Sequence, residues 1–212
     1  MTMSLHYIKR EPKIIKDKNP LLLLLHGYGS NEEDLFSFAQ ELPGQYYVIS
    51  VRAPHSLMYG SYAWYAINFD ADENKFSDVL QAKASRDLIL DIIEELKAKY
   101  PIDSEQITLL GFSQGAILSY AAALKSPEII QRVAALSGYL NMEMVDDISK
   151  EVSKLKMFIS HGSVDQVIPV EWARKAAPEL KKMGIEVTYK EYPIGHGVAP
   201  QNFWDMVKWL ES

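Results

Sequence analysis

The chain of 212 residues contains no cysteine. Disulfide bonds, thiolate zinc sites, iron–sulfur clusters and cysteine nucleophiles are therefore excluded. Any covalent chemistry must use a serine, threonine, lysine or carboxylate side chain.

Long apolar segments are also missing. The longest uninterrupted apolar run extends only from Tyr62 to Ile67, whereas a membrane-spanning helix needs about 20 apolar residues. The first residues, MTMSLHYIKREPK, contain no apolar stretch behind their basic residues, so we expect no secretory signal. These features predict a cytoplasmic protein without a transmembrane segment.

Positive charge is scarce relative to negative charge. Lys and Arg number 22 against 28 Asp and Glu, which gives a formal net charge of −6. The long-range field of the protein therefore opposes polyanions, and no Lys/Arg cluster reverses it locally. We expect no nucleic-acid partner.

The remaining composition is that of a compact globular protein, with 48% hydrophobic and 24% charged residues. A chain of this length forms one ordinary domain, and neither an internal repeat nor a low-complexity linker divides it. We predict a single domain over residues 1–212.

Short apolar runs typical of buried strands alternate with longer amphipathic segments typical of helices. Pro20 and Gly27 flank a run of leucines that is too short for a helix, so a buried strand is favoured there. Continuous apolar strands separated by helices indicate an α/β fold with a mostly parallel central sheet and helices on both faces. The predicted strands cover residues 21–25, 46–51, 107–110, 133–137, 156–160 and 187–192, with 5–10 as a further edge strand.

Helix signals lie between these strands. Ser30 and Glu33 have the spacing of a capping box, Ser77 precedes a long helical run, and Pro200 opens another. Pro178 interrupts a further helical pattern, which we expect to end or kink just before it.

Ligands of parallel α/β sheets bind beyond the carboxyl ends of the strands, and one of these loops carries the motif GFSQG at 111–115. The motif follows a predicted strand and opens a helix, which is the context of a nucleophile elbow. Because small flanking residues allow a strained turn that exposes the hydroxyl, Ser113 is the candidate nucleophile. The pentapeptide alone also fits a plain strand-to-helix turn in which Ser113 caps the helix.

A nucleophilic serine needs an imidazole to accept its proton and an anionic group to orient that imidazole. His196 lies between glycines after the last predicted strand, and Asp165 follows the strand at 156–160. The order Ser, Asp, His is the one expected for this architecture, although each residue alone also suits an ordinary turn. Asp146 and Asp147 are alternative acids, but they precede a strand and so lie at the wrong edge of the sheet.

Acyl transfer also requires hydrogen-bond donors for the developing oxyanion. The recurrent donors are the main-chain N–H after the nucleophile and one from an early glycine-rich loop. Gln114 and Tyr28, the latter in the motif HGYG at 26–29, occupy these places. The motif matches neither a phosphate-binding loop nor a dinucleotide-binding loop, which leaves an ordinary glycine turn as its alternative.

The motifs HGYGS, GFSQG, HGSVDQVIP and GHG occur in this order between about residues 21 and 210. The chain thereby resembles the carboxylesterase and phospholipase family of α/β-hydrolases, which includes lysophospholipases and acyl-protein thioesterases. The resemblance implies an α/β-hydrolase fold and a serine hydrolase that needs neither a cofactor nor a metal. The residues it assigns are Ser113, Asp165 and His196 as the triad, and Tyr28 and Gln114 as the oxyanion hole.

Two residues depart from the family pattern. Ala116 stands where the family often has a second glycine, and Ser30 stands where thioesterases often have aspartate. Both departures leave the triad intact but weaken the assignment to the thioesterases in particular.

The segment from Ala53 to Phe76 is the least regular and most aromatic part of the chain. Part of it, RAPH at 52–55 with Trp64 and Tyr65 downstream, resembles a family segment that borders the acyl pocket. We interpret the segment as a wall of the substrate site, with Trp64, Tyr65 and Met58 as substrate-binding residues. The alternative is a hydrophobic cluster packed against the sheet.

We therefore predict an enzyme that cleaves small or single-chain carboxylic esters through an acyl-enzyme intermediate, as carboxylesterases and lysophospholipases do. A chain of 212 residues leaves no room for an inserted cap domain, so we expect an open site. The alternatives are an acyl-protein thioesterase, an acyltransferase or a peptidase on the same scaffold, and a catalytically silent ligand-binding protein. The sequence leaves a homodimer open as an assembly.

Overall fold

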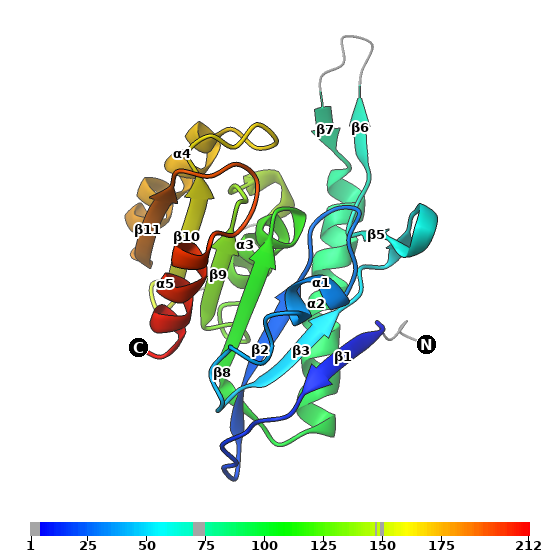
Figure 1. Ribbon diagram of the computed structural model, residues 1–212, viewed down its shortest axis with the longest axis vertical. Helices are drawn as coiled ribbons and strands as arrows, with labels where there is room; N and C mark the ends of the chain where they lie inside the picture. The colour runs from blue at the N-terminus through cyan, green and yellow to red at the C-terminus, as the bar shows by residue number, and fades with distance from the viewer. Residues whose placement is uncertain (1–4, 70–74, 147, 149–150) are drawn as a thin grey trace.

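The computed structural model of the chain describes residues 5–69, 75–146, 148 and 151–212. The strands of the main sheet are β1 (Tyr7–Arg10), β2 (Asn19–Leu25), β3 (Tyr47–Val51), β8 (Ile102–Phe112), β9 (Arg132–Leu136), β10 (Lys156–Gly162) and β11 (Glu186–Tyr192). They form a seven-stranded sheet in the order β1-β3-β2-β8-β9-β10-β11 (Figure 1). Every neighbouring pair is parallel except β1 with β3, so the predicted mostly parallel sheet is confirmed.

The remaining elements connect these strands. The helices are α1 (Glu33–Phe36), α2 (Val79–Lys99), α3 (Gln114–Lys125), α4 (Val170–Lys182) and α5 (Pro200–Leu210), with short 3-10 turns η1 (Met58–Gly60) and η2 (Met142–Met144). Two hairpins stand outside the main sheet, namely β4 (His55–Ser56) with β5 (Tyr62–Ala63) and β6 (Ile67–Phe69) with β7 (Lys75–Ser77). Among the described residues, no helix is both long enough and apolar enough to cross a bilayer.

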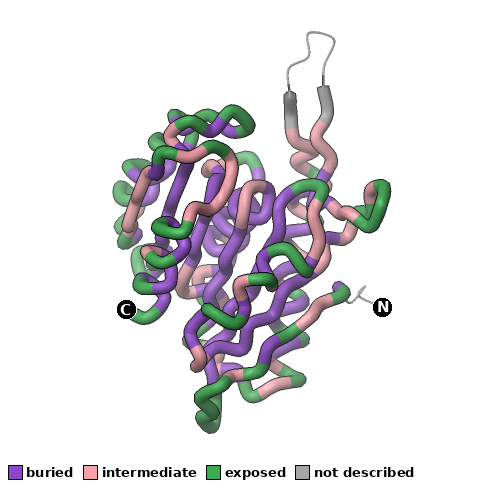
Figure 2. The backbone as a smooth tube through the Cα atoms, viewed as in Figure 1, coloured by how far each residue is buried: buried purple, intermediate pink, exposed green. Residues whose placement is uncertain are grey.

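The leucines of β2 show why helices cover both faces of the sheet. Leu21, Leu23 and Leu25 point into one hydrophobic cluster, which includes residues of α2, α3 and α4. Leu22 and Leu24 point into a second cluster on the other face, with residues of α1 and α5. All five are fully buried, as the continuous run predicts, and the buried strands form the centre of the molecule (Figure 2).

The predicted capping box at Ser30 is wrong. α1 begins at Glu33, and its N-cap is Glu32, whose side chain makes no capping bond. Asn31 Oδ1 accepts the Glu33 N–H at 2.9 Å, so the donor that a capping serine would bind is already satisfied. The Ser30 hydroxyl instead donates to Asp34 Oδ2 at 2.7 Å.

The helix does not end just before Pro178, so this part of the prediction is wrong, while the alternative of a kink stays a prediction. α4 continues through this residue to Lys182. A proline within a helix removes one backbone hydrogen bond, but buried residues on both sides of it, Ala176, Ala177 and Leu180, pack into the core against the sheet. Tertiary packing of these residues therefore outweighs the local preference.

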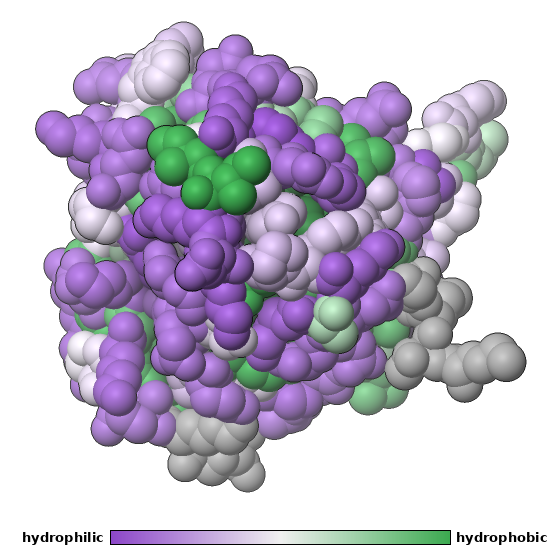
Figure 3. All heavy atoms as spheres, turned by 90° about the horizontal axis from the view of Figure 1, so that it is seen from below, coloured by the Kyte–Doolittle hydropathy of each residue, from purple (hydrophilic) through white to green (hydrophobic). Residues whose placement is uncertain are grey.

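β2 begins at the lower end of the sheet, opposite the end at which the parallel strands terminate (Figure 1). Buried Asn19 holds the loop before β2 by donating to the carbonyls of Ile14 and Gln45, each at 2.8 Å. The loop exposes Ile14 and Ile15. Seen from this end, the surface is mostly hydrophilic, with a compact apolar patch and several smaller apolar areas (Figure 3).

Candidate active site

Ser113 occupies a strained turn between β8 and α3. Its backbone has φ 53° and ψ −115°, a conformation that residues other than glycine rarely adopt. The flanking glycines are required by close packing, because a Cβ on Gly115 would lie 2.1 Å from the carbonyl oxygen of Leu25. The Ser113 side chain makes no capping bond to α3, which contradicts its interpretation as a helix cap.

The structure brings the three predicted triad residues together from the loops after β8, β10 and β11. His196 Nε2 lies 2.9 Å from Ser113 Oγ, and His196 Nδ1 lies 2.7 Å from Asp165 Oδ2. With the proton on Nδ1 donated to the carboxylate, Nε2 is free to accept the serine proton. The aromatic ring of Phe112 packs against the imidazole, with a centroid distance of 5.0 Å.

Asp165 is held as an anion by hydrogen bonds. Its side chain is fully buried, and Oδ1 accepts the N–H groups of Val167 at 2.8 Å and Ile168 at 2.9 Å. Burial alone would raise the pKa of Asp165, but these bonds and the one from His196 outweigh it and lower that pKa below its usual value. His161 is also buried. Its Nε2 lies 3.3 Å from Asp165 Oδ2 and forms a hydrogen bond of 2.8 Å with the Ile168 carbonyl.

The alternative acids occupy another part of the structure. Asp146 pairs with Arg86 at 2.7 Å and with Lys83 at 3.0 Å, and these cations lower the pKa of its carboxyl. Asp147 lies outside the described residues. Asp165 is therefore the acid that the structure places beside His196.

Tyr28 and Gln114 both line the same cavity as Ser113 and His196. Tyr28 lies in a tight turn in which Gly29 has φ +75°, a conformation that glycine adopts without strain. Gln114 is the first residue of α3. Neither main-chain N–H donates a hydrogen bond within the described part of the chain. Their assignment to an oxyanion hole stays a prediction.

The side chain of Gln114 has a role that the sequence did not indicate. It is buried, its Nε2 donates to the Tyr65 carbonyl at 2.8 Å, and its Oε1 accepts the Trp64 N–H at 2.8 Å. The indole of Trp64 in turn donates to the carbonyl of His26 at 2.9 Å. These bonds tie the aromatic segment to the elbow and to the HGYG loop.

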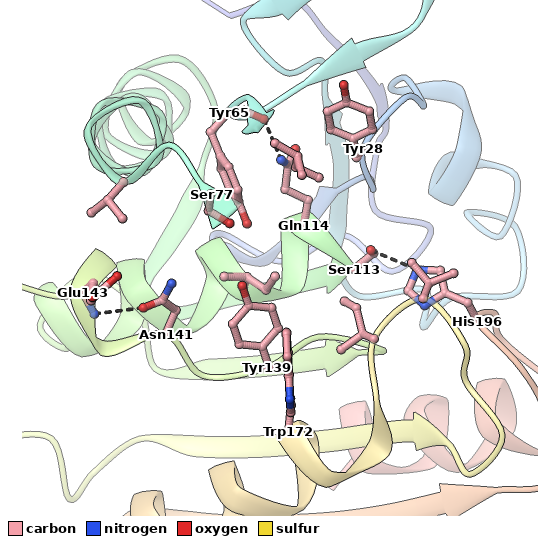
Figure 4. A pocket seen from close by; sticks show the side chains of 15 residues that line it. Tyr28, Tyr65, Ser77, Ser113, Gln114, Tyr139, Asn141, Glu143, Trp172 and His196 are labelled. Atoms are coloured by element: carbon pink, nitrogen blue, oxygen red, sulfur yellow. Dashed lines mark hydrogen bonds between the residues drawn. The ribbon is translucent and has the colours of Figure 1, made fainter. Parts of the chain in front are cut away.

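The cavity beside the triad has a volume of about 430 Å³. Its aromatic lining residues include Tyr28, Tyr65, Tyr139 and Trp172. In the close view, Tyr28 lies above Ser113, whereas Tyr65, Tyr139 and Trp172 lie between Ser113 and Glu143 (Figure 4). Aliphatic side chains from α3 and from the loop after β10 complete the walls. Burial raises the pKa of Tyr65, so its hydroxyl remains protonated.

The aromatic segment contributes less to this cavity than the sequence interpretation proposes. Tyr65 lines it, but Trp64 and Met58 do not. Trp64 is fully buried behind the cavity, where its N–H binds His26, and Met58 is 69% exposed in η1. Contrary to the predicted substrate contact, Trp64 and Met58 therefore do not line this cavity.

Other lining residues come from segments that the sequence interpretation left without a role. Tyr139, Asn141 and Glu143 follow β9, and Trp172 lies in α4. A signal was present, because the sequence SGYL follows a strand at the functional edge of the sheet. Among the described residues, no group of three or more His, Asp or Glu side chains is placed to hold a metal ion.

Comparison with known proteins adds an independent finding. The phospholipase/carboxylesterase family model matches residues 12–212. A probable carboxylesterase of Oryza sativa is 31% identical over 114 residues, which cover 52% of this chain and 43% of the relative. Acyl-protein thioesterase 1 of Kluyveromyces lactis is 31% identical over 156 residues, which cover 71% of this chain and 68% of the relative.

The chain spans about half the length of several curated relatives. The match covers 43% of the Oryza sativa protein, 44% of a probable carboxylesterase of Arabidopsis thaliana and 55% of acyl-protein thioesterase 1 of Aspergillus fumigatus. Two solved structures match almost throughout. The Bacillus cereus carboxylesterase superposes with a TM-score of 0.85 at 18% identity, covering 99% of this chain and 95% of that one. Esterase PE8 has a TM-score of 0.84 at 22% identity, with 99% of each chain covered. At these identities the likeness shows the fold, and the predicted α/β-hydrolase fold is confirmed.

Proposed function

The chain belongs to the phospholipase/carboxylesterase family, and from this premise we propose that it is a serine hydrolase that cleaves carboxylic esters through an acyl-enzyme intermediate. The observation that carries the proposal is the continuous hydrogen-bond path from Asp165 through His196 to Ser113, which opens into a cavity. Such a path converts a weakly nucleophilic hydroxyl into one that can attack an ester.

In the first step, Ser113 Oγ forms a bond to the ester carbonyl carbon while His196 Nε2 takes the hydroxyl proton. Asp165 keeps the imidazole in the required tautomer and stabilises the imidazolium that forms. Because its carboxylate accepts two backbone N–H bonds and has a lowered pKa, it remains anionic during this step.

The carbonyl oxygen becomes an oxyanion in the tetrahedral intermediate. The main-chain N–H groups of Tyr28 and Gln114 are the donors for this charge, since both residues line the cavity and neither N–H has another described partner. As the intermediate collapses, the bond to the alcohol oxygen breaks, and His196 returns its proton to that oxygen. The acyl group remains on Ser113.

Deacylation repeats these steps with water as the nucleophile. His196 accepts a proton from the water, the hydroxide oxygen bonds to the acyl carbon, and the bond to Ser113 breaks as the serine regains its proton. The products are a carboxylic acid and the free enzyme. The cavity of about 430 Å³ has room for one short or medium acyl chain and suits it better than an aggregated lipid.

An acyl-protein thioesterase is the second candidate, because relatives that match this chain bear that name. The same residues would attack a thioester carbonyl, with a thiolate as the leaving group. A pair of substrates with the same acyl chain, one an oxygen ester and one a thioester, distinguishes the two by their kcat/KM values.

A fluorophosphonate that phosphonylates activated serines tests the proposal. Label should appear on Ser113 and disappear in Ser113→Ala. The matched control is Ser137→Ala, because Ser137 also has φ 53° and follows a strand, but its hydroxyl bonds to the Gly197 carbonyl at 3.4 Å and not to a histidine. Label mapped to a serine other than Ser113, or ester hydrolysis that survives Ser113→Ala, would overturn the assignment.

A further inference from the structure

The cavity has a polar end remote from the triad. Glu143, Asn141 and Ser77 line this end, whereas Ser113 and His196 lie on the other side of the cavity (Figure 4). Among the described residues that line the cavity, Glu143 is the only carboxylate, and there is no lysine or arginine. The remote end is therefore anionic without a compensating cation.

The backbone that carries Glu143 is firmly anchored. Asn141 Oδ1 accepts the Glu143 N–H at 3.0 Å, and the next residue, Met144, is fully buried. Buried Arg86 donates to the Met144 carbonyl at 2.6 Å and pairs with Asp146 at 2.7 Å. The buried arginine and the hydrophobic anchor therefore fix the backbone at this position, from which the exposed side chain of Glu143 extends.

Two polar groups at this end, the Glu143 carboxylate and the Asn141 amide nitrogen, have no described protein partner. Of the nearby cations, Arg86 and Lys83 pair with Asp146, and Lys175 lines the neighbouring groove but not this cavity. No ion pair of the Glu143 carboxylate and no hydrogen bond from Asn141 Nδ2 occurs within the part of the chain that the structure describes. A negative charge and an amide donor thus remain available to a ligand.

Aromatic rings lie beside these groups. The rings of Tyr139 and Trp172 meet edge to face, with centroids 5.0 Å apart, and Tyr65 stands on the opposite wall in the close view (Figure 4). The faces of such rings attract cations, and a carboxylate strengthens that attraction. An anionic group would instead meet Glu143 with no cation to offset the repulsion.

We infer that the end of the cavity formed by Glu143, Asn141, Tyr139 and Trp172 binds an ammonium group of the substrate, so the enzyme prefers esters that carry a cation several bonds from the scissile carbonyl. This inference rests on the proposed ester hydrolysis. The cation can belong to the acyl part, as in an amino-acid-like acyl chain, or to the alcohol part, as in a choline-type ester. Glu143 is then a specificity-determining residue and not a catalytic one.

Substrate pairs that differ only in charge test the inference. On the acyl side these are ethyl 6-aminohexanoate and ethyl heptanoate, in which a methyl group replaces the ammonium, with ethyl hydrogen pimelate as the anionic counterpart. On the alcohol side they are butyrylcholine and 3,3-dimethylbutyl butyrate. In at least one pair, kcat/KM for the cationic ester should exceed that for its neutral partner by about 5- to 10-fold. The pair that shows the preference identifies the side that carries the cation.

The variant Glu143→Gln should reduce this ratio, leaving only the attraction of the rings, and should raise kcat/KM for the pimelate relative to ethyl heptanoate. Because the readout is a ratio measured on each protein, a general loss of activity cancels. The matched control is Glu179→Gln, which removes the same charge from an exposed residue of a neighbouring groove that Trp172 also lines. Glu179→Gln should keep the wild-type ratio.

Each result decides the question. Equal cleavage of cationic and neutral esters by the wild type overturns the inference while leaving ester hydrolysis intact, as does a ratio that Glu143→Gln leaves unchanged. Equal loss of the ratio in Glu179→Gln attributes the preference to the overall field and also overturns it. If no ester is cleaved and Ser113 takes no fluorophosphonate, the proposed function fails and this inference fails with it.

Discussion

The indole N–H of Trp64 donates a hydrogen bond to the main-chain carbonyl of His26, 2.9 Å away. His26 also accepts the Ala53 N–H at Nε2, at 3.1 Å, and its Nδ1 lies 2.8 Å from the Gly27 carbonyl. The loop that carries Tyr28 is therefore supported by the aromatic segment and not only by its own turn. Trp64 is a positioning residue for that loop.

Trp64→Phe removes the indole donor but keeps a buried aromatic ring. The His26 carbonyl then lacks this partner in a buried site, which should lower the free energy of unfolding by about 1–3 kcal/mol. We expect kcat to fall by about 10-fold through the displaced loop, because one oxyanion donor is worth 10²–10³ when lost entirely. Urea unfolding and kcat across a series of acyl lengths measure both effects.

The exposed Trp204 provides the control for this substitution, since it is 57% exposed and Trp204→Phe should change neither quantity. The order of preference among acyl lengths should stay the same in Trp64→Phe. A shifted order would place the ring in contact with substrate after all.

Asp165→Asn should lower turnover by about 10⁴, because an amide favours the wrong histidine tautomer. Asp146→Asn should retain most of the turnover per folded molecule, because the Asp146 carboxylate pairs with Arg86 and Lys83. Steady-state kinetics on one neutral ester compares the two variants. Asp165 is not the orienting acid if its amide variant keeps more than about a tenth of the turnover.

Gly115→Ala tests the close packing under the elbow. The added Cβ would lie 2.1 Å from the Leu25 carbonyl oxygen, so α3 must move away from β2. We expect a loss of about 2–3 kcal/mol in the free energy of unfolding, together with a loss of activity from the displaced Ser113. Gly197→Ala is the matched control for stability, because its Cβ would have no neighbour within 4 Å.

Glu191 contributes a pH-dependent stability. Arg174 holds its carboxylate through bonds of 2.7 Å to each oxygen and lowers the pKa of Glu191 from 4.5 to about 2. A lowered folded-state pKa gives a contribution that is fully present above pH 4.5 and is lost as the pH falls toward 2. Because Arg174 is half exposed, we expect Glu191→Gln to cost no more than about 1 kcal/mol at pH 7.

Urea unfolding at a series of pH values measures this difference between wild type and Glu191→Gln. The difference should shrink as the pH falls through the window below 4.5. Glu171→Gln is the control, because its oxygen lies 3.3 Å from Arg174 on an exposed side chain and should contribute little. A difference that stays constant with pH would exclude the ion pair as its origin.

The proximity of Ser113, Asp165 and His196 could be predicted from the sequence because each of them follows a strand at the same edge of the sheet. Ser113, Asp165 and His196 lie far apart in the chain, but a parallel sheet brings the loops after its strands to one edge. Glycines flank Ser113 and His196 in the sequence, and close packing explains the glycine at Gly115.

The side-chain directions in the aromatic segment could not be predicted in the same way. Trp64 and Tyr65 are neighbours, yet only Tyr65 lines the cavity, because Trp64 turns toward His26. Composition shows that such a segment is apolar but not which ring meets solvent, substrate or core. The helix end predicted at Pro178 is wrong for a related reason, since buried contacts on both sides hold the helix together.

The hydrogen bond between Ser113 and His196 joins residues 83 positions apart, and β11, which precedes His196, pairs only with β10 at the edge of the sheet. Closing such long chain segments carries an entropy cost, so we expect these contacts to form late in folding. A molecule whose edge strand has not yet docked has a serine without its base. The recovery of ester hydrolysis during refolding should therefore report the docking of β11, and a partly folded chain remains inert toward esters.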